Sequence, residues 1–139
     1  MHIVLVMVGG IVVRVPRLRP DTGLCEFDHV DRWFKANKRA REAARICLNC
    51  PIIVACGEKA LQLGVTDGVW ASVEMPGARN AADLEDARAK LREVIARFRH
   101  QSPQSRLRSL RIRQAVHFAA IQRQTRPVPA PHSTDKKSA

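Results

Sequence analysis

The sequence predicts a mainly α-helical fold, in which a small bundle of short helices surrounds a four-cysteine site and is followed by basic helices and a disordered tail. Apolar residues recur at helical spacing in several stretches, most clearly over 84–98. Three of the four cysteines fall within ten residues, from Cys47 to Cys56. The chain has only four Phe, two Trp and no Tyr among 139 residues, so its core is small. A core of this size favours a metal centre as a stabilising staple.

The first thirteen residues are almost entirely apolar. Gly9 and Gly10 separate two β-branched stretches, Ile3–Val8 and Ile11–Val13, which predicts a short strand or hairpin. The segment has no basic region before its apolar run and no small-residue cleavage pattern after it, unlike a secretory signal. It is also shorter than the roughly 20 apolar residues that a membrane span requires. We therefore expect a cytoplasmic protein without a membrane partner, in which thiols stay reduced.

Helical periodicity and capping residues predict the remaining elements. Helices are expected over Phe27–Phe34, Lys38–Ile46, Pro51–Leu63 and Ala81–Arg99, and from Ser105 to Gln124. The expected N-caps are Asn37, Cys50, Asn80 and Ser105, and Gly64 is expected to end the third helix. The chain accordingly divides into a leader (1–22), a cysteine domain (23–76), a basic helical region (77–126) and a disordered tail (127–139).

The net charge of +11 is concentrated in the C-terminal half. Between Arg88 and Arg126 there are eleven Arg or Lys residues and a single acid, Glu93. This imbalance favours a polyanionic partner, most simply DNA, over an ordinary solvated helix surface. The densest group, and our candidate for phosphate contacts, is Arg106, Arg108, Arg111 and Arg113.

The four cysteines are candidate ligands of one inorganic centre. Cys47 and Cys50 form a C-x-x-C pair, Cys56 follows closely, and Cys25 precedes the pair at a distance. Structural zinc usually takes two short C-x-x-C knuckles, and only one is present here. Iron–sulfur cubanes accept more varied spacing, so the pattern favours a cluster while leaving zinc open. Two weaker hypotheses are a disulfide framework and four buried cysteines that are unrelated to one another.

The order of several motifs makes the pattern more specific. A lone Cys25 is followed by the aromatic pair Trp33-Phe34, then by the run 47–56 (CLNCPIIVAC), and then by Gly68-Val69-Trp70 and the basic region. This arrangement resembles the WhiB-like family of actinobacteria and their phages over residues 23–72. The chain departs from the family pattern at Ala71-Ser72, where the family has Gly-Gly. Because Ala and Ser tolerate positive φ poorly, we expect this turn to be reshaped and partner binding to be affected.

The resemblance implies a redox-responsive transcriptional regulator. It implies that Cys25, Cys47, Cys50 and Cys56 bind a 4Fe–4S cluster that reacts with O₂ or nitric oxide. It also implies that Gly68, Val69 and Trp70 contact the C-terminal domain of the primary sigma factor of RNA polymerase, although Trp70 can equally cover the core. The chain is then not an enzyme and is a monomer apart from its sigma partner.

Two alternatives of other classes stay open. In the first, the metal-free form uses Cys47 and Cys50 as a protein disulfide reductase, although no thioredoxin-like βαβ pattern surrounds the pair. In the second, the chain is a zinc-stabilised DNA-binding module without redox sensing.

Overall fold

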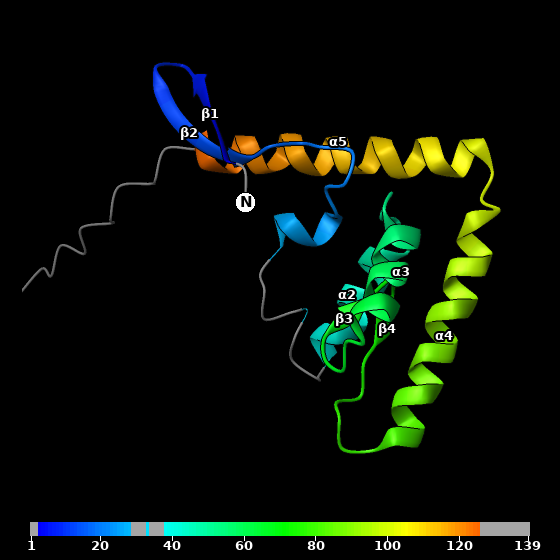
Figure 1. Ribbon diagram of the computed structural model, residues 1–139. Coiled ribbons are helices and arrows are strands. Elements are labelled where there is room, and N and C mark those ends of the chain that lie inside the picture. Colours follow the sequence, from blue (N-terminus) through cyan, green and yellow to red (C-terminus); the bar gives the residue numbers. More distant parts are fainter. Residues whose placement is uncertain (1–2, 29–32, 34–37, 126–139) are drawn as a thin grey trace, which may run out of the picture.

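The computed structural model describes residues 3–28, 33 and 38–125, and its fold is mainly helical, as the sequence predicts (Figure 1). In chain order the elements are strands β1 (Ile3–Val8) and β2 (Ile11–Pro16), the 3-10 helix η1 (Leu24–Phe27), helices α2 (Lys38–Cys47) and α3 (Ile53–Leu63), strands β3 (Val69–Trp70) and β4 (Val73–Glu74), and helices α4 (Ala81–Arg99) and α5 (Pro103–Thr125). Most of the expected helix over 27–34, the expected cap Asn37 and the tail 127–139 lie outside the described residues.

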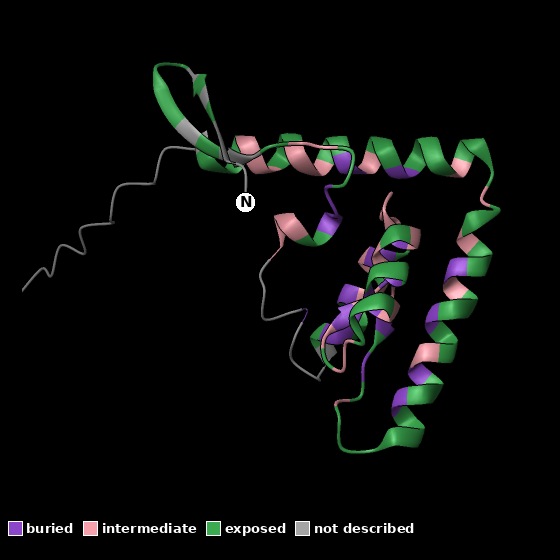
Figure 2. Cartoon of the chain, viewed as in Figure 1, coloured by how far each residue is buried: buried purple, intermediate pink, exposed green. Residues whose placement is uncertain are grey.

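Helices α4 and α5 form two arms that meet at a sharp corner, and the cysteine-bearing elements lie in the angle between them. Figure 1 shows α2, α3 and the β3–β4 hairpin beside α4, with η1 and the β1–β2 hairpin beside α5. Figure 2 shows buried positions on the inner sides of α4 and of the first half of α5. The elements that carry the cysteines are therefore flanked by α4 and α5.

The main hydrophobic core lies between α3, α4 and the β3–β4 hairpin. Leu91 is fully buried at its centre, and the stripe predicted for α4 faces this core. Gly57 on α3 makes the close approach of the helices possible, since a Cβ atom there would lie 2.9 Å from Ile95 Cγ1. The buried members are Ile53, Ala60, Ala71, Val73, Met75, Leu84, Ala87 and Leu91.

Helix α4 begins and ends where the sequence predicts. The side chain of Asn80 accepts hydrogen bonds from the backbone N–H of Ala82 at 2.9 Å and of Asp83 at 3.3 Å. This cap satisfies two of the donors that a helix N-terminus leaves free. Gly64, with φ 62° and ψ 39°, likewise ends α3 in the expected left-handed conformation.

The starts of α3 and α5 differ from the predictions. Helix α3 begins at Ile53 with Ile52 as its N-cap, so Cys50 precedes the helix and does not cap it. Helix α5 begins at Pro103, and its cap is Ser102, whose hydroxyl accepts from the N–H of Ser105 at 3.2 Å. Proline is favoured at the first helical position because its missing N–H needs no partner there.

The most buried side chains of α5 are polar. Leu107 and Leu110 are 47% and 44% exposed, whereas Ser109 and Arg113 are buried. Helix α5 packs on β2 and η1, so the C-terminal helix returns to the N-terminal segment.

The apolar leader forms the expected hairpin. Strand β1 pairs with β2 in antiparallel register, with Val8 opposite Ile11 and a two-residue turn between them. Gly9 and Gly10 both have positive φ (58° and 83°), as such a tight turn requires. Among the described residues, no helix has the length and hydropathy needed to cross a membrane.

Candidate metal centre

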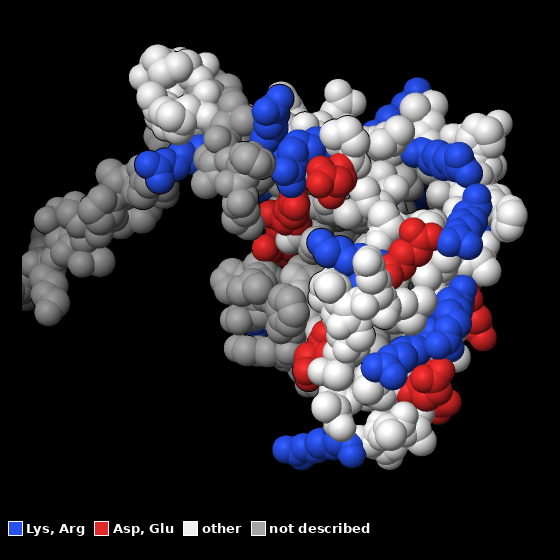
Figure 3. Space-filling view, viewed as in Figure 1, with Lys and Arg blue, Asp and Glu red and all other residues white. Residues whose placement is uncertain are grey.

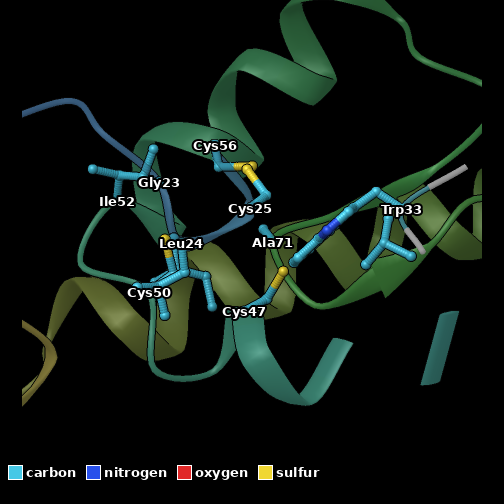
Figure 4. A pocket seen from close by; sticks show the side chains of 11 residues that line it. Gly23, Leu24, Cys25, Trp33, Cys47, Cys50, Ile52, Cys56 and Ala71 are labelled. Carbon is cyan, nitrogen blue, oxygen red and sulfur yellow. The ribbon is translucent and has the colours of Figure 1, made fainter. Parts of the chain in front are cut away.

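The four cysteines lie around one hollow although they come from separate segments of the chain. Cys25 lies in η1, Cys47 ends α2, Cys50 lies in the turn that follows, and Cys56 lies in the first turn of α3. All four line the same pocket, and Figure 4 shows their side chains around it. The structure thus brings together every residue that the sequence nominated as a metal ligand.

The turn between α2 and α3 explains how three of these thiols reach one place. The backbone N–H of Cys50 donates to the carbonyl of Cys47 at 2.9 Å, which folds the C-x-x-C segment back on itself. The N–H of Ile53 then donates to the carbonyl of Cys50 at 3.3 Å, and the N–H of Cys56 to the carbonyl of Ile52 at 2.8 Å. Cys56 therefore lies near the N-terminal end of α3, on the same side as the turn.

The hollow is apolar apart from its sulfur atoms, and it contains about 340 Å³ of empty space, part of it open to solvent. Gly23 makes room for the first cysteine, because a Cβ atom there would lie 3.3 Å from Cys25 Sγ and 3.2 Å from Ile52 Cδ1. The other lining residues are Leu24, Trp33, Ile52, Ile53, Val69 and Ala71. Sequence reasoning missed Gly23, whose place directly before a cysteine was the only available signal.

The surroundings raise the pKa of three of the four thiols. Burial raises the pKa of the Cys47 thiol to about 12, and the thiolates of its cysteine neighbours would raise it further. Burial also raises the pKa of Cys25 to about 11, with Cys50 and Cys56 adding to the effect, and it raises the pKa of Cys56. A positively charged guest such as a metal centre would favour the thiolate forms of these three residues.

Two backbone amides from the β3–β4 turn point at these sulfurs. The N–H of Ser72 donates to Cys47 and that of Ala71 donates to Cys56, and each hydrogen bond lowers the pKa of its thiol. Hydrogen bonds to the ligand sulfurs are one of the means by which proteins tune iron–sulfur centres.

Ala71 and Ser72 adopt the left-handed backbone that their residue types disfavour. They form the two-residue loop of the β3–β4 hairpin, with φ values of 46° and 72°. Both residues are thus left-handed, as a type I′ turn requires, despite the cost for residues with a Cβ atom. The hydrogen bonds to Cys47 and Cys56 and the burial of Ala71, which is 1% exposed, offset this cost.

The raised thiol pKa values predict how the metal-free protein responds to pH. Because the fold favours the protonated thiols, Cys25 and Cys47 stabilise it fully below pH 9, the usual thiol pKa, and lose this contribution as pH rises towards 11 and 12. We expect the free energy of unfolding of the metal-free protein, measured with denaturant, to fall over this range. A Cys47→Ala variant should show a shallower fall, and an equally steep fall would mean that other groups cause it.

The residues nominated for sigma-factor binding have unequal exposure. Val69 is 8% exposed and lines the hollow, so it belongs to the core and not to a contact surface. Trp70 is half-buried, and its Nε1 donates to the carbonyl of Asp67 at 2.9 Å. Gly68 has φ 85° at the bend before β3. Trp33 is buried beside the site, whereas Phe34 lies outside the described residues.

The four nominated arginines also separate into two groups. Arg106, Arg108 and Arg111 are exposed on α5. Arg113 is 8% exposed, and its Nη1 donates to the carbonyls of Pro20 at 3.0 Å and Thr22 at 3.3 Å. Arg113 is therefore a structural residue, and its nomination as a DNA contact is corrected. Figure 3 shows Lys and Arg side chains along the outer sides of α4 and α5, interleaved with acids along α4.

The four thiols line one hollow and do not gather at a single point. Within the described part of the chain, no group of three or more His, Cys, Asp or Glu residues is placed to hold one metal ion. A cubane needs only one thiolate at each of its four irons, so its ligands surround a space and do not converge on a point. Four thiols that line one apolar hollow have this kind of arrangement.

One comparison with known proteins gives a match. Residues 20–81 match the family model described as "Transcription factor WhiB". The matched segment contains η1, α2, α3, the β3–β4 hairpin and all four cysteines. No curated protein and no solved structure gives a significant match.

Proposed function

We propose that the chain, whose residues 20–81 match the WhiB family of transcription factors, is a transcriptional regulator that binds a 4Fe–4S cluster, the primary sigma factor and promoter DNA. The observation that carries this proposal is the ring of four thiols, from Cys25, Cys47, Cys50 and Cys56, around one apolar hollow. The family match supports the proposed redox response and sigma contact. The charge pattern supports the proposed DNA contact.

In this proposal the four cysteines would hold the cluster as thiolates. When bound, the cluster supplies a redox-active centre that O₂ or nitric oxide can attack. The chain's own residues create the conditions for this chemistry. The apolar walls limit access of water, and the amide N–H groups of Ala71 and Ser72 stabilise negative charge on the sulfurs of Cys56 and Cys47.

The β3–β4 hairpin is the proposed link between this centre and the sigma factor. Its turn donates hydrogen bonds to two ligand sulfurs, and its first strand carries Trp70. A part-exposed tryptophan beside a buried core is typical of a binding hot spot. Because the ligands position the turn, loss of the cluster changes the surface that Trp70 offers to its partner.

Helix α5 is the proposed DNA contact, through Arg106, Arg108 and Arg111. These side chains are exposed, so they can approach phosphates without leaving a packed core. Such contacts contribute affinity more than sequence selectivity, so promoter choice comes from the sigma-bound complex.

Elemental analysis and visible absorption of the anaerobically purified protein test the proposal. We expect iron and acid-labile sulfide in equal amounts, about four atoms of each per chain, with a brown chromophore. Stoichiometric zinc without colour would instead identify a zinc-stabilised DNA-binding module. Absence of metal, together with reduction of insulin disulfides that requires Cys47 and Cys50, would identify the disulfide reductase.

A further inference from the structure

We propose that Arg113 is a positioning residue that couples the basic helix α5 to the segment bearing Cys25, so that occupancy of the metal centre determines where the DNA-binding surface lies. This inference rests on the proposed function, because it assumes that Cys25 is a cluster ligand and that α5 contacts DNA.

The coupling begins with a buried arginine on an otherwise exposed basic helix. Arg113 is 8% exposed, whereas its neighbours in the same cluster, Arg108 and Arg111, point to solvent. Its Nη1 donates to two carbonyls of the N-terminal segment, those of Pro20 at 3.0 Å and Thr22 at 3.3 Å. The guanidinium group is rigid and has several donors, so it can hold two backbone carbonyls at once.

The segment that receives Arg113 is a compact turn. Thr22 is fully buried, and its hydroxyl accepts from the N–H of Arg19 at 2.9 Å and donates to the carbonyl of Arg17 at 3.3 Å. Its own N–H donates to the carbonyl of Arg19 at 3.1 Å. This turn leads directly into Gly23 and η1, so it moves as a unit with Cys25 and carries its movement to Arg113.

A second contact lies on the other side of Cys25. The ring of Phe27 meets that of His117 edge to face, with 5.7 Å between ring centroids. His117 lies one helical turn after Arg113, so both residues are on the inner face of α5. Helix α5 therefore holds the Cys25 segment at two points, one before the cysteine and one after it.

Arg113 alone binds the segment weakly. Within the described residues, its buried Nε has no hydrogen-bond partner. A buried charge that is compensated only by carbonyl dipoles contributes little net stability, because its desolvation opposes the hydrogen bonds it makes. The docked position of α5 consequently depends on what else fixes the Cys25 segment.

The metal centre is that second attachment. Cys25 lines the hollow together with Gly23 and Leu24, and the cysteines of α2 and α3 line the same hollow (Figure 4). A guest that binds Cys25 and these cysteines joins η1 to the rest of the domain. Release of the guest frees η1, and α5 is released with it. This is a route from the cluster to the DNA-binding face that does not pass through the β3–β4 hairpin.

Hydrogen exchange of the full chain tests the coupling. Exchange of the backbone amides over 103–125 is measured by mass spectrometry with the cluster bound and after its removal, while iron content and visible absorption are recorded. Removal of the cluster should speed exchange in α5 about tenfold, as expected for loss of one or two hydrogen bonds. An Arg113→Met variant should retain its iron and colour and already show the faster exchange. Arg113→Lys, which keeps a charged donor, should restore part of the protection.

Arg108→Met is the matched control, because it changes the same charge on the exposed face, and it should exchange like the wild type. Equal protection of α5 with and without the cluster overturns the coupling, as does wild-type protection in the coloured Arg113→Met variant. If Arg113→Met does not fold, the exchange rates of α5 in the wild type with and without the cluster still test the coupling. If the wild-type protein contains no iron, both the proposed function and this inference are contradicted. If it contains iron but the exchange rate of α5 does not change when the cluster is removed, only the inference is contradicted.

Discussion

A Cys56→Ala variant is expected to lose the brown chromophore and to bind almost no iron. Cys56 lines the hollow from the first turn of α3, and its sulfur accepts a hydrogen bond from the N–H of Ala71. Its loss removes one of four ligands and one anchor of the β3–β4 hairpin. Because binding of a structural metal contributes directly to folding, the helical circular dichroism signal and the melting temperature should both fall. Anaerobic absorption spectra, iron analysis and thermal melts measure these effects.

Leu63→Ala provides a control on the same helix. Leu63 is 61% exposed at the end of α3, away from the hollow, so this variant should keep its colour and its melting temperature. A Cys56→Ala protein that remains brown and equally helical contradicts ligation by Cys56. In that event Cys56 is not the fourth ligand of the proposed cluster.

An Arg108→Ala/Arg111→Ala double variant should bind DNA much more weakly while keeping its colour. Both side chains are exposed on α5, so their removal leaves the packing of the helix unchanged. If each contacts one phosphate, the dependence of log K on log salt should become shallower by about 2. The loss should be similar for every DNA sequence, because phosphate contacts carry no sequence information. Fluorescence anisotropy titrations at several salt concentrations measure both effects.

Arg88→Ala/Arg92→Ala is a control with the same change in charge. Both residues lie on α4 and pair with Glu85, at 3.9 Å and 3.0 Å, so part of their charge is already compensated. Their removal should reduce DNA binding only slightly. If both double variants lose the same amount of DNA affinity, the effect comes from overall charge and not from a specific surface of α5.

The elements predicted well from the sequence are those in which one local signal determines the structure. The apolar stripe and the Asn80 cap define α4, and the structure confirms both of its ends. Gly64 ends α3, and the Gly9-Gly10 pair turns the leader hairpin. The convergence of the four cysteines followed from their residue type together with the family resemblance, which supplied the long-range information that spacing lacked.

The errors arose where tertiary contacts decide. Arg113 looks like its neighbours in the sequence, but α5 turns it towards carbonyls far away along the chain. Val69 was nominated for a surface and belongs to the wall of the hollow. The left-handed conformations of Ala71 and Ser72 contradict their local preferences because sulfur acceptors and packing compensate the cost. Local propensity predicts none of these outcomes.

The contact between Arg113 and Thr22 has a consequence for how the protein is made. These residues are separated by 91 positions, so the contact closes a long loop, at an entropic cost of about 4 kcal/mol for a flexible chain. During translation the N-terminal part leaves the ribosome first and cannot meet Arg113 until α5 has also emerged. The nascent chain therefore carries the Cys25 segment without its contact to α5 for most of its synthesis, and this contact forms only after α5 has left the ribosome.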